Sequence, residues 1–187
     1  MLSLELTSTI QLILKLQGVL LHLNRIGGTV KRSLFVTEYV IVSVFRGHRI
    51  LLVEKDRPEW QKGKLNLVGG KIEAGESPVD AVIRELREET GLETECETVR
   101  VCGKIVGDDY VVHCAVCCVC EHVEDLEPKP REGETEKVSW HQFSVVKNDP
   151  RLIPNLKIIF PLLLMEIEGW EIRNTSSDCR DFSIHLL

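Results

Sequence analysis

The chain has 187 residues, 43% of them hydrophobic, and a formal net charge of −6 at pH 7. This length and composition predict one domain with an ordinary core, and the lack of any lysine-arginine run argues against a nucleic-acid-binding protein. Seven cysteines without a recognisable secretory leader predict a cytoplasmic protein in which the thiols stay reduced.

The first 32 residues form a separate segment. Ser8 followed by Gln11 is a capping-box signal, apolar residues then recur at helical spacing, and Gly27-Gly28 would end the helix. The apolar run is too short for a membrane span, and no basic region or cleavage site of a signal peptide is present. We expect residues 1–32 to be an N-terminal extension, either an amphipathic helix that docks or forms a homodimer or an upstream leader, and residues 33–187 to be a single domain.

A β-hairpin is predicted next. Tyr39–Phe45 and Arg49–Lys55 are runs rich in β-branched residues, separated by a short turn with a glycine. Asp56–Lys64 then reads as a polar loop. Its exposed aromatic residue, Trp60, could pack on the loop or stack on a base, and the sequence leaves both interpretations open.

One helix has clear signals at both ends. Ser77 is a good N-cap, Pro78 suits the first helical position, and Gly91 suits the residue just past the end. These signals predict a helix over Pro78–Thr90, with an apolar face formed by Val79, Val82, Ile83 and Leu86.

Three carboxylates of this helix fall on one stripe, namely Glu85, Glu88 and Glu89. Each pair of like charges at this spacing destabilises a helix by roughly 0.2 to 0.5 kcal/mol unless a positive group lies among them. Carboxylate oxygens at this spacing suit Mg2+, although a solvated acidic face would show the same pattern.

The residues around this helix resemble the Nudix box of the Nudix hydrolase family. The box spans Gly70 to Leu92 and matches at each fixed position: Gly70, Glu76, Arg84, Glu85, Leu86, Glu88, Glu89, Gly91 and Leu92. The resemblance implies an α+β fold, a Nudix-type α/β/α sandwich with a central mixed β-sheet. It also implies an enzyme, a nucleotide pyrophosphatase that hydrolyses a phosphoanhydride bond in a nucleoside diphosphate derivative.

The same resemblance implies roles for individual residues. Glu85, Glu88 and Glu89 would hold Mg2+, for which Mn2+ could substitute, with help from the backbone carbonyl of Gly70. Glu76 and Arg84 would form an ion pair that fixes the loop against the helix. The carboxylate that takes a proton from the attacking water is left open among Glu85, Glu89 and a loop glutamate.

Two further strands are predicted beyond the box. Thr98–Val106 and Tyr110–Val123 are joined by a Gly-Asp-Asp turn, and the second strand is nearly all apolar, as a strand covered on both faces would be. The cysteines in this strand, Cys114, Cys117, Cys118 and Cys120, are expected to be buried structural residues, because no partner pair follows at zinc-site spacing.

A charged loop over Glu124–Thr135 leads to a short predicted strand, Glu136–Trp140. In Nudix enzymes such a loop often supplies one more glutamate to the metal or to the water. The candidates here are Glu132, Glu134 and Glu136, the last two as metal ligands.

The C-terminal part is predicted to hold a helix and a hairpin. Helical spacing relates Leu156, Ile159, Phe160, Leu163 and Leu164, although Pro161 would kink the helix or open a new one. Trp170–Ile172 and Phe182–Leu186 could pair across the stretch Asn174–Asp178.

Two side chains favour different substrates. The stretch Lys64–Lys71 resembles the one in oxidised-purine triphosphatases where an asparagine, here Asn66, hydrogen-bonds the base, so a damaged or non-standard nucleoside triphosphate is the first hypothesis. Tyr110 lies near where dinucleoside-polyphosphate hydrolases place a tyrosine, so such dinucleotides, or ADP-ribose, are the second. A non-catalytic nucleotide-sensing module is the third. The expected substrate-binding residues are Asn66, Trp60, Lys71 and Tyr110, with a small-molecule nucleotide as partner and neither nucleic acid nor membrane.

Overall fold

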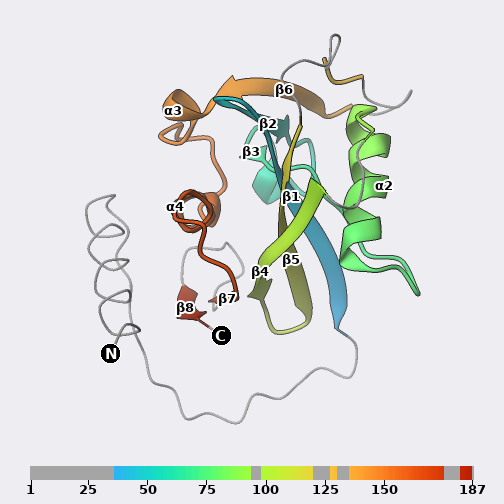
Figure 1. The fold of residues 1–187 in the computed structure, drawn as a ribbon, viewed down its shortest axis with the longest axis vertical. Coiled ribbons are helices and arrows are strands. Elements are labelled where there is room, and N and C mark those ends of the chain that lie inside the picture. The colour runs from blue at the N-terminus through green and yellow to red at the C-terminus, as the bar shows by residue number, and fades with distance from the viewer. Residues whose placement is uncertain (1–35, 94–97, 120–126, 130–134, 175–181, 187) are drawn as a thin grey trace.

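The computed structural model describes residues 36–93, 98–119, 127–129, 135–174 and 182–186. Within these residues the strands form one mixed sheet in the order β3-β2-β1-β5-β4-β7-β8, with β6 pairing with β2 outside this path. Figure 1 shows the helix α2 on one side of the sheet and α3 and α4 on the other. The expected α+β sandwich with a central mixed sheet is therefore confirmed. The predicted N-terminal helix and the candidates Glu132 and Glu134 lie outside the described residues.

The first hairpin is confirmed in its position. Strand β1 spans Thr37–Arg46, β2 spans Arg49–Glu54, and Gly47 in the turn between them has a φ of 54°, which favours glycine. The two strands pair only beside this turn, at Arg46 with Arg49 and at Phe45 with Ile50. On its other edge β1 pairs in parallel with β5 (Tyr110–Cys118), from Thr37 to Phe45.

Strand β2 continues the sheet on its other side. It pairs with β6 (Lys137–Gln142) along its length and with the two-residue β3 (Leu65–Asn66) at its end. The connection predicted as a polar loop contains a single 3-10 turn, η1, over Glu59–Gln61. Strand β6 begins and ends later than predicted, so Glu136 immediately precedes it, and the short helix α3 (Phe143–Val146) follows.

Strands β4 (Val99–Val106) and β5 (Tyr110–Cys118) form the predicted antiparallel pair. Strand β5 ends at Cys118, earlier than expected, and residues 120–123 of the predicted strand are among those the structure does not describe.

The cysteine prediction is confirmed for Cys114 and Cys117, which are buried, and wrong for Cys118, which is exposed at the strand end. Cys120 falls outside the described residues. Burial raises the pKa of Cys102, on β4, to about 11, and it also raises the pKa of Cys114. Thiols whose pKa is raised by apolar surroundings are chemically inert, which fits packing residues.

The C-terminal hairpin has the predicted pairing. Strands β7 (Trp170–Asn174) and β8 (Phe182–Leu186) are antiparallel, and β7 joins the main sheet in parallel with β4. Trp170 is fully buried because β4 has a glycine, Gly103, where any Cβ would lie 2.2 Å from its ring.

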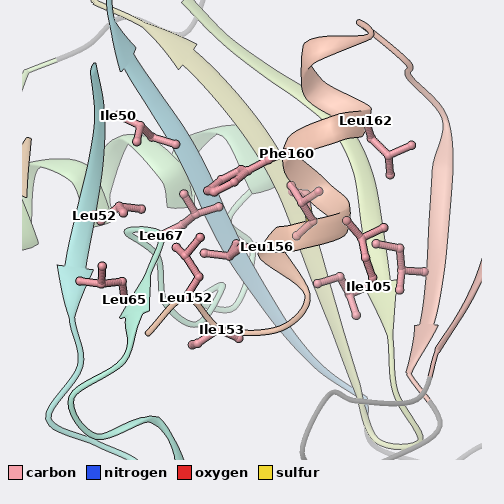
Figure 2. Packing of buried hydrophobic residues seen from close by; sticks show 14 of the residues in the cluster. Ile50, Leu52, Leu65, Leu67, Ile105, Leu152, Ile153, Leu156, Phe160 and Leu162 are labelled. Atoms are coloured by element: carbon pink, nitrogen blue, oxygen red, sulfur yellow. The ribbon is translucent and has the colours of Figure 1, made fainter. Parts of the chain in front are cut away.

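The sheet separates two apolar cores. On one side α2 (Pro78–Thr90) covers β1, β4 and β5 through Ala81, Val82 and Leu86. On the other side α4 (Leu156–Leu164) packs Leu156, Phe160 and Leu162 toward the sheet, as Figure 2 shows.

The details of α4 differ from the prediction. The helix runs on through Pro161 as one element, and Leu164, assigned above to its apolar face, is 59% exposed. Ile158 and Leu162 are buried instead, in the core cluster that also includes Trp170 of β7. Among the described helices, none has the length and apolar character required to span a membrane.

Candidate active site

Helix α2 places its three glutamates beside its buried face. The Ser77 hydroxyl accepts a hydrogen bond from the Asp80 amide at 3.2 Å, and Gly91 ends the helix at a φ of 70°. Both predicted caps are therefore confirmed. The helix is oriented by the burial of Val82 and Leu86, so the carboxylates lie along the edge of this interface, and Glu85 is itself buried.

Arg84 lies among these acids. Its Nε and Nη2 donate to the two carboxylate oxygens of Glu76, both at 2.9 Å, and Nη1 donates to Glu85 at 2.8 Å and to Glu88 at 3.5 Å. Its Nη2 also reaches the carbonyl of Lys71 at 2.9 Å. The guanidinium lowers the pKa of Glu76 and reduces the repulsion among the helix carboxylates. The Glu76–Arg84 pair thus joins the glycine-containing loop to α2.

The loop before the helix touches the carboxylates through its backbone. The amide of Gly69 donates to Glu89 Oε2 at 3.3 Å, and a Cβ on Gly70 would lie 2.1 Å from Glu85 Oε1. The carbonyl of Gly70 accepts a hydrogen bond from the Val40 amide at 2.8 Å, which leaves it one lone pair. Only glycine allows the carboxylate of Glu85 to lie against this loop.

Burial makes the ionised patch unfavourable. It raises the pKa of Glu85, against the opposing effect of Arg84, and it raises the pKa of Glu89 to about 7, against the effects of Lys55 and the Gly69 amide. Carboxylates that are buried near one another without enough positive charge are typical of functional sites.

The donor chemistry of this patch fits a hard divalent cation, since the side chains offer carboxylate oxygens only. Within the part of the chain that the structure describes, however, no three His, Cys, Asp or Glu side chains are gathered so that they could hold a metal ion. Glu85 and Glu88 are turned toward Arg84 instead. For all three carboxylates to bind one cation, the side chains of Glu85 and Glu88 would have to leave Arg84 and turn toward Glu89.

Replacing Gly70 tests the contact between the loop and the patch. We expect Gly70→Ala to lower kcat at least tenfold, because its Cβ would overlap the Glu85 carboxylate and force that side chain away. Gly63→Ala is the matched control, since Gly63 has a φ of 72° but nothing within 4 Å of its Cβ, so it should lose stability and not activity. Equal kcat values for Gly70→Ala and the parent chain would show that Glu85 is not needed in this position.

Glu136 lies near Glu89, the third carboxylate of the patch. Its carboxylate accepts from the Lys55 ammonium at 2.5 Å and from the Asp56 amide at 3.1 Å, and both side chains of the ion pair are largely buried. Lys55 and Glu136 also influence the ionisation of Glu89. Of the three loop glutamates considered above, Glu136 is the one that the structure describes, and it lies in the neighbourhood of the helix carboxylates.

A cavity of about 420 Å3 opens beside the patch. It extends from Gly69 and Gly70 to an apolar wall that includes Ile105 and Ile153. Three of the four predicted substrate-binding residues line it, namely Trp60, Asn66 and Tyr110. Lys71 is not among the lining residues; its side chain is exposed.

Two of these residues also have local roles. Asn66 Oδ1 accepts from the Leu67 amide at 2.8 Å, and its Nδ2 donates to the Gln61 side chain at 3.2 Å. The ring of Tyr110 lies against Gly107, where a Cβ would meet it at 2.2 Å. Trp60 is 39% exposed and carries the Lys64 ammonium 5.5 Å from its ring.

Of the cavity residues that sequence reasoning missed, Asn155 is the one with a buried side-chain oxygen that lacks a partner among the described residues. It occupies the N-cap position of α4, but its side chain makes no capping hydrogen bond. Instead Asn155 Oδ1 is buried at the cavity, with no hydrogen-bond partner among the described residues. Because asparagine before a helix normally signals a cap, its sequence position gave no indication that it lines the cavity.

The chain is similar to several known proteins. The family model for the NUDIX domain matches residues 36–163. The oxidized purine nucleoside triphosphate hydrolase of Mus musculus is 32% identical over 132 residues, which cover 68% of this chain and 80% of that protein. The ADP-sugar pyrophosphatase of Mus musculus is 34% identical over 106 residues, which cover 54% of this chain and 46% of that protein.

A solved structure shares the fold. The crystal structure of the mutator MutT protein from Bacillus halodurans superposes with a TM-score of 0.62 at 20% identity, covering 80% of this chain and 97% of that one. At this identity the likeness concerns the fold.

Proposed function

The chain belongs to the Nudix hydrolase family, and we propose that it hydrolyses a damaged or otherwise non-standard nucleoside triphosphate, with Mg2+ as cofactor, to the monophosphate and pyrophosphate. Membership makes the chain a hydrolase that acts on nucleotide derivatives, and sets aside the non-catalytic sensing module. The choice of substrate within that class is the proposal.

The observation that supports a nucleobase in the cavity is its lining, in which the side-chain oxygen of Asn155 is buried without a hydrogen-bond partner among the described residues. A buried polar group without a partner costs about 1 to 3 kcal/mol, so a ligand that hydrogen-bonds it gains affinity and discrimination. Asn66 lines the same cavity, as do the aromatic residues Trp60 and Tyr110. Amides and aromatic rings in one apolar cavity suit a planar base with polar edges.

The phosphates would lie at the glycine end of this cavity, next to the helix carboxylates. Glu85, Glu88 and Glu89 would hold the cation, with the free lone pair of the Gly70 carbonyl as a further ligand. A bound Mg2+ neutralises phosphate charge and lowers the pKa of a water molecule. Arg84 and Glu76 keep the loop and helix in register, so they are positioning residues rather than groups that touch the substrate.

A proton acceptor for the attacking water is proposed among Glu85, Glu89 and Glu136. Glu136 is already hydrogen-bonded to Lys55 and to the Asp56 amide, so its carboxylate is fixed in place and its charge is balanced by Lys55. This arrangement suits a carboxylate that binds the attacking water and orients it.

The relative from Mus musculus that acts on oxidised purine nucleoside triphosphates supports the same substrate class. The direct experiment is to incubate the protein with Mg2+ and a panel of ordinary and oxidised nucleoside triphosphates, dinucleoside polyphosphates and ADP-ribose. We expect the highest kcat/KM for one non-standard triphosphate, with monophosphate and pyrophosphate as products. A clear preference for a dinucleotide or ADP-ribose would refute the triphosphate proposal and leave the reaction class intact.

Dinucleoside polyphosphates remain the second candidate because Tyr110 lines the cavity. ADP-ribose is the weaker form of this candidate. The ADP-sugar pyrophosphatase relative matches over only 46% of its own length.

Three alanine variants separate these candidates. Asn155→Ala and Asn66→Ala should each cost about 1 to 3 kcal/mol in kcat/KM for the preferred triphosphate, because a base edge would lose its partner, and should change poor substrates little. If Tyr110 instead stacks on the second nucleoside of a dinucleoside polyphosphate, Tyr110→Ala should raise KM for that substrate alone, since stacking contributes equally to ground and transition states. Asn148→Ala, just after α3 and not among the residues that line the cavity, is the matched control. Loss confined to Tyr110→Ala on the dinucleotide would make the second candidate correct.

We further propose that residues 33–187 form one domain in the cytosol. Strands β7 and β8 extend the same sheet beyond residue 163, where the family match ends, so they belong to the catalytic unit. The free cysteines at 102, 114, 117 and 118 are compatible with a reducing compartment.

A further inference from the structure

A second hollow lies between α3 and α4, away from the active site. It has a volume of about 430 Å3, and its lining includes Phe143, Lys147, Lys157, Phe160 and Leu164. A neighbouring hollow of about 440 Å3 shares Phe143 and Leu164 and continues toward the turn between β1 and β2. We call the two together the α3–α4 groove.

The α3–α4 groove is separate from the nucleotide cavity. The two have no lining residue in common: the cavity reaches Gly69 and Gly70, whereas the groove lies between α3 and α4. The groove therefore has no place in the proposed hydrolysis and requires an explanation of its own.

The charge of the groove is opposite to that of the protein. Lys147 follows α3 and Lys157 lies on α4, both are exposed, and neither forms a salt bridge with any residue that the structure describes. In a chain with a net charge of −6, two lysines without acidic partners beside one hollow attract an anion.

The floor of the groove is apolar and fixed. The Phe143 ring packs edge-on against Phe45 at 5.6 Å and against Phe160 at 5.2 Å, measured between ring centroids. Leu164 is 59% exposed at the rim, and Val145 on α3 is 72% exposed nearby in sequence. An exposed leucine at the rim, above packed aromatic rings, favours an apolar ligand.

We propose that the α3–α4 groove binds an anionic amphiphile in monomeric form, a molecule with a carboxylate or phosphate head and a linear apolar chain. The head lies between Lys147 and Lys157. The chain crosses Phe143 and Leu164 into the second hollow. Each hollow is within the size range of small-molecule sites, so a single molecule, and not a bilayer surface, is the occupant that the volume favours.

Isothermal titration calorimetry of the full chain with decanoate and with decyl phosphate tests this proposal. We expect saturable binding of one molecule per chain for both, and no comparable binding of acetate, inorganic phosphate or decyltrimethylammonium, which lack the tail or the negative head. Lys147→Gln combined with Lys157→Gln should weaken decanoate binding at least tenfold, and Leu164→Ser should weaken it as well. Lys137→Gln, on β6, is the matched control with unchanged binding, and all variants should keep their nucleotide hydrolysis.

Several results would overturn the proposal. They are the absence of saturable decanoate binding, equal binding of the cationic amphiphile, and unchanged affinity in the double lysine variant. Co-sedimentation with phosphatidylserine vesicles without binding of monomeric decanoate would identify a membrane surface instead. A concentration-dependent dimer that excludes decanoate would identify a second copy of the chain as the occupant.

Discussion

Removal of divalent cations with excess EDTA is expected to abolish nucleotide hydrolysis, and Mg2+ or Mn2+ to restore it. At an effective dielectric constant of 20, two like charges 4 Å apart repel by about 4 kcal/mol. The site already contains three helix carboxylates, Glu85, Glu88 and Glu89, and Arg84 contacts only the first two of them. A triphosphate adds several negative charges, so we expect turnover to fall by about three orders of magnitude or more without a cation.

A second readout separates metal binding from catalysis. Ligand at about one hundred times its Kd stabilises a folded protein by about 2.7 kcal/mol, so Mg2+ should raise the Tm of the parent chain. Glu85→Gln should lose this increase together with activity. Full hydrolysis in the presence of excess chelator would contradict the metal-dependent mechanism, whatever the thermal melts show.

Glu89→Gln should have opposite effects on activity and on stability. We expect kcat to fall at least a hundredfold, because a proposed metal ligand becomes a neutral amide of the same shape. The metal-free variant should nevertheless be more stable than the parent chain at pH 8. Burial raises the pKa of Glu89 from 4.5 to about 7, which corresponds to a cost on the order of 3 kcal/mol for keeping the carboxylate ionised in the folded state.

The pH dependence of this stability difference follows from linkage. A raised pKa means that the folded chain binds a proton more tightly than the unfolded chain, so the ionisation cost is fully present above pH 7 and disappears as the pH falls toward 4.5. The stability gain of Glu89→Gln should therefore be greatest near pH 8 and shrink as the pH is lowered to 5.

Thermal or urea unfolding of both chains in EDTA at these two pH values measures the effect. Glu88→Gln is the control, because the Glu88 side chain is 44% exposed and interacts with Arg84. A Glu89→Gln variant that is active but no more stable than the parent would mean that Glu89 is a solvated surface residue.

The helix at the active site could be predicted closely from sequence because its determinants are local. Ser77, Pro78 and Gly91 act within a few residues of themselves, and both ends agree with the structure. The same reasoning predicted α4 and its apolar face but not the exposure of Leu164, since burial at the end of that helix depends on distant parts of the chain.

Neighbours across the sheet could not be predicted from periodicity. Strand β1 pairs in parallel with β5, and β6 pairs with β2. In both cases the sequence of one strand does not indicate which other strand it pairs with. Nor could periodicity show that Asn66 and Tyr110 line one cavity. Asn155 escaped notice because its buried, unpaired oxygen is a property of the packed cavity and not of the sequence near it.

The parallel pairing of β1 with β5 also has a consequence for the folding of this chain. Strand β1 obtains this neighbour only after α2 and β4 have been synthesised, because β5 follows both of them in the chain. Non-local pairings of this kind slow folding and leave apolar surface open while they form. A fragment that stops before Tyr110 would contain all the proposed residues of α2 and its loop, yet the helix would lack one of the three strands that it contacts. The contiguous motif that identifies the family is therefore not an autonomous unit, and its chemistry depends on a strand made after it.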